Sequence, residues 1–268
     1  MEKIVGHENE INLLNKTIVE DKIAHAYLFS GREGIGKKIV ATSFAEKVIG
    51  TNISNLKIIE PENDIIKIEA IRNLITDIYL KPTDSSKKVF IINDADKMNT
   101  NAQNALLKVL EEPPIYAVLI LITSNKERII NTILSRVTEI KFNSLSNEEL
   151  TLIIGEEKDY SFARGSAKKA LEMKDSKVAE LAKEIVEVFK TNSYIDINKK
   201  IGQVKADGEK IIEVLEFVKI YYFNGLREDT YKKIEIIKLI DNTIRDLKRN
   251  ANEDLTLDKL IIEKCRLK

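Results

Sequence analysis

Gly31-Arg32-Glu33-Gly34-Ile35-Gly36-Lys37-Lys38 is the stretch that decides the fold of this chain. The apolar run before it, residues 26–29, predicts a buried strand, and residues 39–49 after it carry apolar side chains at helical spacing. A glycine-rich turn between a strand and a helix is typical of a phosphate-binding P-loop. The glycines let backbone N–H groups point inward at a phosphate, and the helix N-terminus adds positive potential.

The last two residues of this stretch point to different conclusions about nucleotide binding. Lys37 stands where a P-loop has its phosphate-binding lysine, but Lys38 stands where a Ser or Thr hydroxyl should ligate Mg²⁺. An ammonium group cannot ligate a cation and repels one. Two interpretations therefore stay open: the loop is kept only as a scaffold, or it still binds nucleotide through Lys37 and the turns at Gly31, Gly34 and Gly36.

Composition sets the broad class of the protein. The 268 residues are enough for two or three modest domains, and 43% hydrophobic with 32% charged residues is typical of soluble globular chains. The formal net charge of zero gives no whole-chain electrostatic signal for nucleic acid or for an acidic membrane. The single cysteine, Cys265, excludes internal disulfides and a cysteine-based zinc site. Without a bilayer-length apolar run or a signal-peptide pattern, we expect a cytoplasmic protein.

Strand and helix patterns alternate through the first half of the chain. Short apolar runs predict further strands, and apolar residues at helical spacing predict helices between them. Such alternation predicts an α/β domain with a doubly wound, largely parallel sheet. The strands fall at residues 56–59, 89–92, 118–122 and 139–142, and the helices at 8–19, at 68–78 and from Asn99 or Thr100 onward.

The second half is predicted to be helical, because all four prolines lie before residue 115. Ser146 and Glu149 have the spacing of a capping box that opens a new helical unit. Residues 178–188, 211–222 and 234–247 predict longer helices whose apolar residues are too numerous for one narrow stripe. Such helices pack against one another, against a partner, or both.

Polar residues follow two of the predicted strands directly. Asn93 and Asp94 come after strand 89–92, and Thr123 and Ser124 lie at the end of strand 118–122. The carboxyl ends of parallel strands are where α/β folds place ligand chemistry. Asp94, together with Asp96, has an alternative role as an acidic residue that complements the N-terminus of the following helix.

An ordered set of motifs resembles one protein family. The four segments are His25-Ala26-Tyr27-Leu28-Phe29, the P-loop, Ala105-Leu106-Leu107-Lys108-Val109-Leu110-Glu111-Glu112-Pro113-Pro114, and Ser135-Arg136. Together they resemble the bacterial clamp-loader subunits of DNA polymerase III. The resemblance implies an AAA+ fold in three parts: a P-loop α/β domain over residues 1–144, a small helical lid over 145–180, and an all-α collar for oligomerisation over 181–268.

Departures from the family pattern indicate which subunit type this chain resembles. The ATP-hydrolysing gamma/tau members carry Thr or Ser in place of Lys38, and Asp-Glu in place of Asn93 and Asp94, where the Asp holds Mg²⁺ and the Glu acts on the attacking water. The resemblance therefore implies a delta-prime-like subunit of the polymerase III holoenzyme without an ATPase of its own and with no required cofactor. An ATP-hydrolysing gamma/tau-type subunit is the alternative. A free-standing nucleotide kinase is disfavoured, because it too needs the missing hydroxyl.

A second departure concerns zinc. The family's cysteine cluster would fall between Ile49 and Leu56, where this chain has only six residues and no cysteine. No zinc or other metal site is therefore expected.

The resemblance also assigns roles to single residues. It makes Arg136 an arginine finger that reaches a neighbour's ATP site, against the alternative of a surface salt bridge. It makes Thr123 and Ser124 phosphate sensors, against strand-end hydrogen bonding, and it places Lys168 at a second sensor position, against a solvated surface lysine. The implied partners are gamma/tau and delta subunits and, through the assembled complex, the sliding clamp and primer–template DNA. The two histidines suggest no catalysis.

Overall fold

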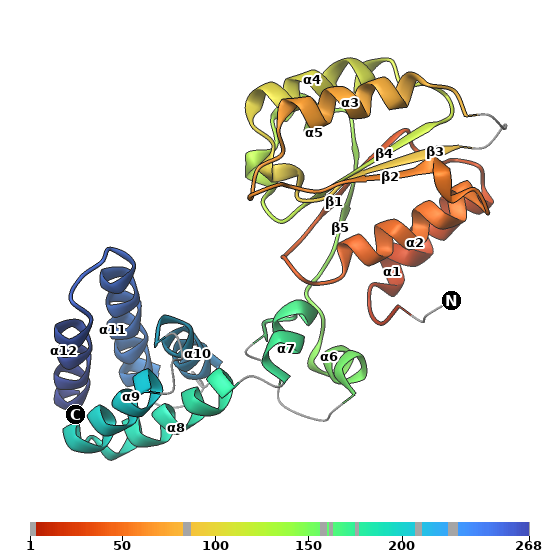
Figure 1. The fold of residues 1–268 in the computed structure, drawn as a ribbon. Helices are drawn as coiled ribbons and strands as arrows, with labels where there is room; N and C mark the ends of the chain where they lie inside the picture. The colour runs from red at the N-terminus through yellow and green to blue at the C-terminus, as the bar shows by residue number, and fades with distance from the viewer. Residues whose placement is uncertain are drawn as a thin grey trace. The chain divides into compact units, whose positions relative to one another are not determined.

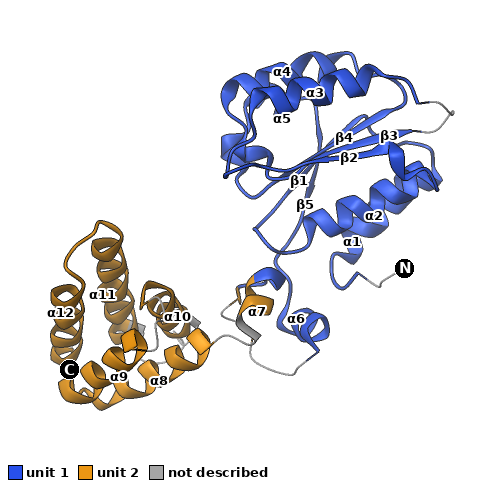
Figure 2. Cartoon of the chain, in the orientation of Figure 1, with its two compact units in different colours: residues 1–158, 164–168 blue, residues 159–163, 169–268 orange. Residues whose placement is uncertain are grey.

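The computed structural model describes residues 4–82, 87–155, 160, 163–174, 177–206, 211–224 and 230–267. They belong to two compact units (Figure 2). Unit 1 comprises residues 1–158 and 164–168, and unit 2 comprises residues 159–163 and 169–268. The predicted boundary after residue 144 falls inside unit 1, and the division into three domains stays a prediction.

Unit 1 is built on a five-stranded sheet in the order β2-β3-β4-β1-β5, in which every pair of neighbouring strands is parallel. The parallel sheet predicted from the sequence is thus confirmed, with strand ends that agree to within one residue. The strands are β1 (Ala26–Ser30), β2 (Leu56–Ile59), β3 (Lys88–Ile92), β4 (Ala117–Thr123) and β5 (Thr138–Lys141).

Helices cover both faces of this sheet (Figure 1). On one face, α1 (Glu8–Val19) and α2 (Lys37–Ile49) enclose a core that includes Tyr27, Phe29 and Phe44. On the other face, α3 (Ile68–Tyr79), α4 (Thr100–Glu111) and the short α5 (Asn131–Leu134) pack over Leu28 and Phe90. Covering both faces explains why the central strands are continuous apolar runs. Unit 1 also contains α6 (Asn147–Ile154), which begins with the predicted Ser146–Glu149 capping box.

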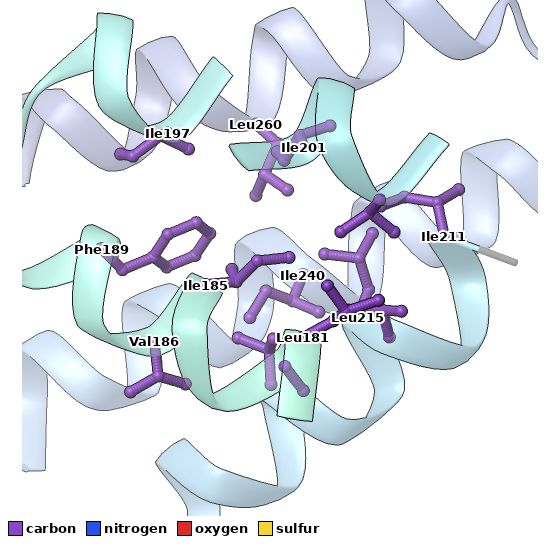
Figure 3. Close-up of a cluster of buried hydrophobic side chains, with 14 of the residues drawn as sticks. Leu181, Ile185, Val186, Phe189, Ile197, Ile201, Ile211, Leu215, Ile240 and Leu260 are labelled. Carbon is purple, nitrogen blue, oxygen red and sulfur yellow. The ribbon is translucent and has the colours of Figure 1, made fainter. Parts of the chain in front are cut away.

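Unit 2 is helical, as the sequence predicts. Its helices are α8 (Lys177–Thr191), α9 (Tyr194–Ala206), α10 (Ile211–Asn224), α11 (Thr230–Lys248) and α12 (Glu253–Arg266), and α7 (Ala167–Lys174) starts in unit 1 and continues into unit 2. Figure 3 shows their shared core, in which Leu181, Ile185, Phe189, Leu215 and Ile240 converge. The helices therefore pack largely against one another. Helices α9 and α12 were not among the sequence predictions.

Strand register determines which residues meet at the carboxyl edge of the sheet. Ser30 of β1 pairs with Thr123 of β4, and Ile59 of β2 pairs with Ile92 of β3. The residues that follow these strands consequently leave the sheet at the same edge. They are Gly31 after β1, Glu60 after β2, Asn93 after β3 and Ser124 after β4.

Candidate functional site

The loop between β1 and α2 has the backbone of a P-loop. Gly31, Gly34 and Gly36 adopt φ values of 149°, 76° and 104°, in the region that favours glycine. A Cβ at Gly31 would lie 2.5 Å from the Phe142 carbonyl oxygen, so a side chain does not fit there. Gly36 precedes α2 and leads directly into Lys37. The predicted strand, glycine-rich turn and helix are all present.

Lys37 is buried inside this loop rather than extended from it. Lys37 is only 6% exposed, and its Nζ donates to the carbonyl oxygens of Gly31 and Arg32 at 2.6 and 2.5 Å. Burial lowers the pKa of Lys37 to about 8, although the carboxylates of Asp94, Asp96 and Glu33 partly counteract that effect. Lys37, at the position of the lysine that binds phosphate in a P-loop, thus has two backbone acceptors within its own loop.

Lys38 points instead to an acidic residue that sequence reasoning missed. Its ammonium nitrogen lies 2.9 Å from Glu60 Oε1, and Asn93 Nδ2 lies 3.4 Å from the same oxygen. The three residues come from α2, from the end of β2 and from the end of β3. Glu60 follows β2 directly, and this position at the carboxyl edge was the signal that could have identified it.

These side chains are a poor fit for Mg²⁺, which takes an octahedral shell of oxygen ligands. Lys38 and Asn93 both present N–H donors to Glu60. Asp94 has a left-handed backbone with φ 50°, and its Oδ2 lies 3.7 Å from Lys97 Nζ. Within the described parts of the chain, no group of three or more His, Cys, Asp or Glu residues could hold a metal ion.

Thr123 and Ser124 both bind Asp96. The Thr123 hydroxyl is fully buried and donates to Asp96 Oδ1 at 2.6 Å, and the Ser124 backbone N–H donates to the same oxygen at 3.1 Å. These bonds join the end of β4 to the 3-10 turn η2 (Ala95–Lys97). Strand-end hydrogen bonding therefore describes their contacts, and the sensor role stays a prediction. Asp96 does not cap α4, whose N-cap is Asn99.

The segment 164–168 lies against the P-loop. The Lys168 backbone N–H donates to the Gly34 carbonyl at 3.1 Å, and Lys168 Nζ lies 2.9 Å from Glu33 Oε1. A Cβ at Gly34 would come within 2.3 Å of the Ser166 hydroxyl oxygen. The ion pair is solvent-exposed and contributes little to stability. Lys168 thus contacts the loop itself, and a role as a phosphate sensor stays a prediction.

Arg136, the predicted finger, lies just beyond α5 with its side chain 33% exposed. Its Nη1 donates to the Thr132 carbonyl oxygen at 2.8 Å and to the Ser135 hydroxyl oxygen at 3.0 Å. Its Nη2 donates to Glu111 Oε1 at 2.9 Å. The salt bridge named as the alternative is therefore present, with a partner that the sequence did not reveal.

Gln103 connects α4 to the segment that leads to this arginine. The side chain is buried, and its Nε2 donates to the carbonyl oxygens of Met98 and Arg128 at 3.2 and 2.9 Å. Its Oε1 accepts from the Ile130 N–H at 2.9 Å. All of its polar atoms are thus used to hold the chain just before α5, which fixes the backbone from which Arg136 projects.

A parallel five-stranded sheet, a P-loop after β1 and a helical C-terminal part define a protein of the AAA+ fold. A family described as "DNA polymerase III, delta subunit" matches residues 6–54 and 46–146, more than half of the chain. The chain belongs to this family of clamp-loader proteins, which is related to gamma/tau.

Curated relatives include several subunit types. The chain is 33% identical over 154 residues to DNA polymerase III subunit delta' of Bacillus subtilis, a match covering 50% of this chain and 47% of that protein. It is 33% identical over 167 residues to subunit tau/gamma of Haemophilus influenzae, covering 55% and 24%. Subunit gamma/tau of Mycoplasma genitalium is 28% identical, with 97% and 50% covered. The chain spans between about a quarter and a half of the length of these relatives.

Solved structures share the fold. A DNA polymerase III gamma subunit-related protein from Thermotoga maritima superposes with a TM-score of 0.62 at 21% identity, over 96% of this chain and 99% of that one. A RuvB mutant from the same organism gives 0.51 at 15% identity, over 94% and 85%. In the described residues no helix is both long enough and apolar enough to cross a membrane.

Proposed function

We propose that this chain is a delta-prime-like subunit of a DNA polymerase III clamp loader. It does not hydrolyse ATP, and it helps its neighbours load the sliding clamp on primed DNA in the cytoplasm during replication. It supplies Arg136 to the ATP site of an adjoining gamma/tau-type subunit. Family membership supports the clamp-loader role, and the side chains around the P-loop support the absence of hydrolysis.

The observation that carries this proposal is the contact between Lys38 and Glu60. In phosphoryl transfer, Mg²⁺ bridges phosphate oxygens and neutralises the developing charge. Here an ammonium group stands in place of the hydroxyl that would hold the metal, and it lies 2.9 Å from Glu60. Asn93, which donates to Glu60 at 3.4 Å, replaces a metal-binding carboxylate. Both changes weaken binding of the same Mg²⁺ ion. ATP hydrolysis in this subunit therefore lacks its main electrostatic stabilisation.

Unit 2 supports a role in assembly. Tyr221, Phe223 and Tyr231, which lie near the ends of α10 and α11, are 47%, 48% and 80% exposed. Aromatic side chains are enriched in the cores of protein interfaces. We assign these helices to the collar that joins the gamma/tau and delta subunits.

The proposal is tested by phosphate release from the isolated, contaminant-free protein with Mg²⁺ and ATP. We expect no turnover above a blank that lacks the protein. The gamma/tau-type alternative is favoured by the intact P-loop backbone at Gly31, Gly34 and Gly36. Robust hydrolysis by the unmodified chain would overturn the present assignment in favour of that alternative.

A further inference from the structure

Glu111 occupies an unfavourable place in its own helix. It is the last residue of α4, and Glu112 follows it as the C-cap. The C-terminus of a helix carries a partial negative charge and favours basic residues, so two consecutive acidic residues there oppose the helix dipole. Natural proteins break such local preferences mainly at positions that serve another purpose.

Glu111 has such a purpose in its contact with Arg136. Its Oε1 accepts a hydrogen bond at 2.9 Å from Nη2 of Arg136, 25 residues away. Glu112 has no such contact with Arg136 within the described chain, although it is equally acidic and lies at the same helix end. The pairing therefore belongs to one of the two acidic residues alone.

Three acceptors hold the guanidinium group of Arg136. Both hydrogens of Nη1 are directed at acceptors on the α5 segment, the Thr132 carbonyl and the Ser135 hydroxyl, and one hydrogen of Nη2 is directed at Glu111. A guanidinium has five N–H donors. The Nε hydrogen and the second hydrogen of Nη2 thus have no acceptor in the part of the chain that the structure describes.

We propose that Glu111 is a positioning residue that orients Arg136 toward the phosphate of an ATP molecule bound by a neighbouring subunit. The proposal rests on the proposed function, since it needs Arg136 to act in trans. A free arginine side chain has many rotamers, and fixing it on binding costs entropy. Glu111 reduces that cost by holding the side chain while two N–H donors stay free for a phosphate oxygen pair.

The test uses the reconstituted clamp loader with primed DNA and measures steady-state ATP hydrolysis. Glu111→Gln should lower kcat by about two- to fivefold, the size expected for an exposed charge pair, and leave KM for ATP unchanged. Glu112→Gln, the matched control, should leave both constants unchanged. In an Arg136→Ala background, Glu111→Gln should have no further effect, because its whole contribution passes through the arginine.

A second readout uses the isolated chain and does not depend on hydrolysis. In ¹⁵N NMR, the Nε–H signal of Arg136 should show faster side-chain motion in Glu111→Gln than in the wild type or in Glu112→Gln. Unaltered motion and unaltered kcat in Glu111→Gln would overturn the positioning role, even where Arg136→Ala slows hydrolysis. A rise in kcat would also overturn it, because Glu111 would then restrain the arginine. If Arg136→Ala itself has no effect, the proposed function fails.

Discussion

Lys38 and Glu60, which are 22 residues apart in sequence, form a 2.9 Å ion pair at the carboxyl edge of the sheet. The pair joins the first turn of α2 to the end of β2, and both side chains are about half exposed. Such a pair contributes only about 0–1 kcal/mol to stability. Its importance is chemical, because it places a fixed positive charge where a P-loop enzyme would bind a metal ion.

The first prediction concerns recovery of the metal site. Lys38→Thr, Asn93→Asp and Asp94→Glu together should create Mg²⁺-dependent ATP binding, because they replace the ammonium group with a hydroxyl, add a carboxylate at residue 93 and lengthen the one at residue 94. Each single substitution should fail, because Lys38→Thr alone leaves an uncharged amide at residue 93, and either of the other two alone leaves the ammonium group of Lys38 in place. Calorimetric titration with ATP, in Mg²⁺ and in EDTA, measures the difference. Magnesium-dependent binding by the unmodified chain would contradict this explanation.

Lys37 should titrate far from the ordinary lysine value. Its pKa of about 8, lowered by burial, predicts a ¹³Cε chemical-shift transition near pH 8. Asp94→Asn should lower this pKa further, because the Asp94 carboxylate raises it. Asp64→Asn is the control, since Asp64 pairs with Lys97 and should not alter the transition. A Lys37 transition near pH 10.5 would show that the buried position is wrong.

The same pKa predicts how stability depends on pH. Between about pH 8 and pH 10.5 the folded protein has released the Lys37 proton while the unfolded chain still holds it. The unfolded state then binds more protons, so the contribution of Lys37 to the free energy of unfolding rises with pH in this window. Urea unfolding at pH 7.5 and pH 10 should show this rise in the wild type and a smaller one in Lys37→Met. Equal slopes in the two proteins would refute it.

Unit 2 contains a buried lysine, Lys264, with one hydrogen-bond partner among the described residues, and that partner can be removed. Lys264 Nζ donates to Asn192 Oδ1 at 2.5 Å and lies 5.4 Å from the Phe189 ring centroid, and burial lowers its pKa. Asn192→Gly should cost about 1–3 kcal/mol, because it leaves a buried donor unpaired. Glycine suits the left-handed backbone of residue 192, where φ is 56°.

A second variant separates this effect from general damage. Lys264→Met keeps an unbranched apolar stem and removes the charge, so it should cost less than Asn192→Gly. In the Lys264→Met background, Asn192→Gly should lose most of its effect on the free energy of unfolding. Additive costs in thermal or urea unfolding would mean that the two side chains do not act as a pair.

The sequence predicts the sheet of unit 1 well, because its strands are short apolar runs between glycine, proline and polar residues. The P-loop and the strand-end residues Asn93 and Thr123 were identified for the same reason, since local pattern specifies them. Helix α9 was missed, because Ile197, Ile201 and Val204 are apolar positions too sparse to stand out in a polar segment.

The partners of the site residues were beyond local pattern. Glu60 pairs with Lys38 across 22 residues, and Glu111 pairs with Arg136 across 25. Charged pairs of this kind depend on which strands and helices become neighbours, and periodicity within one element carries no such information. They become predictable only when the strand order and the helix packing are known.

The proposed function requires that Arg136 act on a reaction in another subunit. A guanidinium meets the charge on a γ-phosphate with forked hydrogen bonds that lysine cannot reproduce, and arginine fingers in trans contribute about 10³–10⁵ in rate in well-studied systems. The loss in a multi-site loader should be smaller, because one site alone faces this subunit. Because lysine lacks the fork, Arg136→Lys should restore little of the rate that Arg136→Ala loses. Both variants should fold and assemble normally.

The most direct test is the steady-state ATPase rate of the reconstituted complex with sliding clamp and primed DNA, wild type against Arg136→Ala. We expect a clear fall in rate and in clamp loading, with the subunit composition of the complex unchanged. An unchanged rate in a correctly assembled complex would contradict this expectation and leave Arg136 as a surface salt bridge with Glu111.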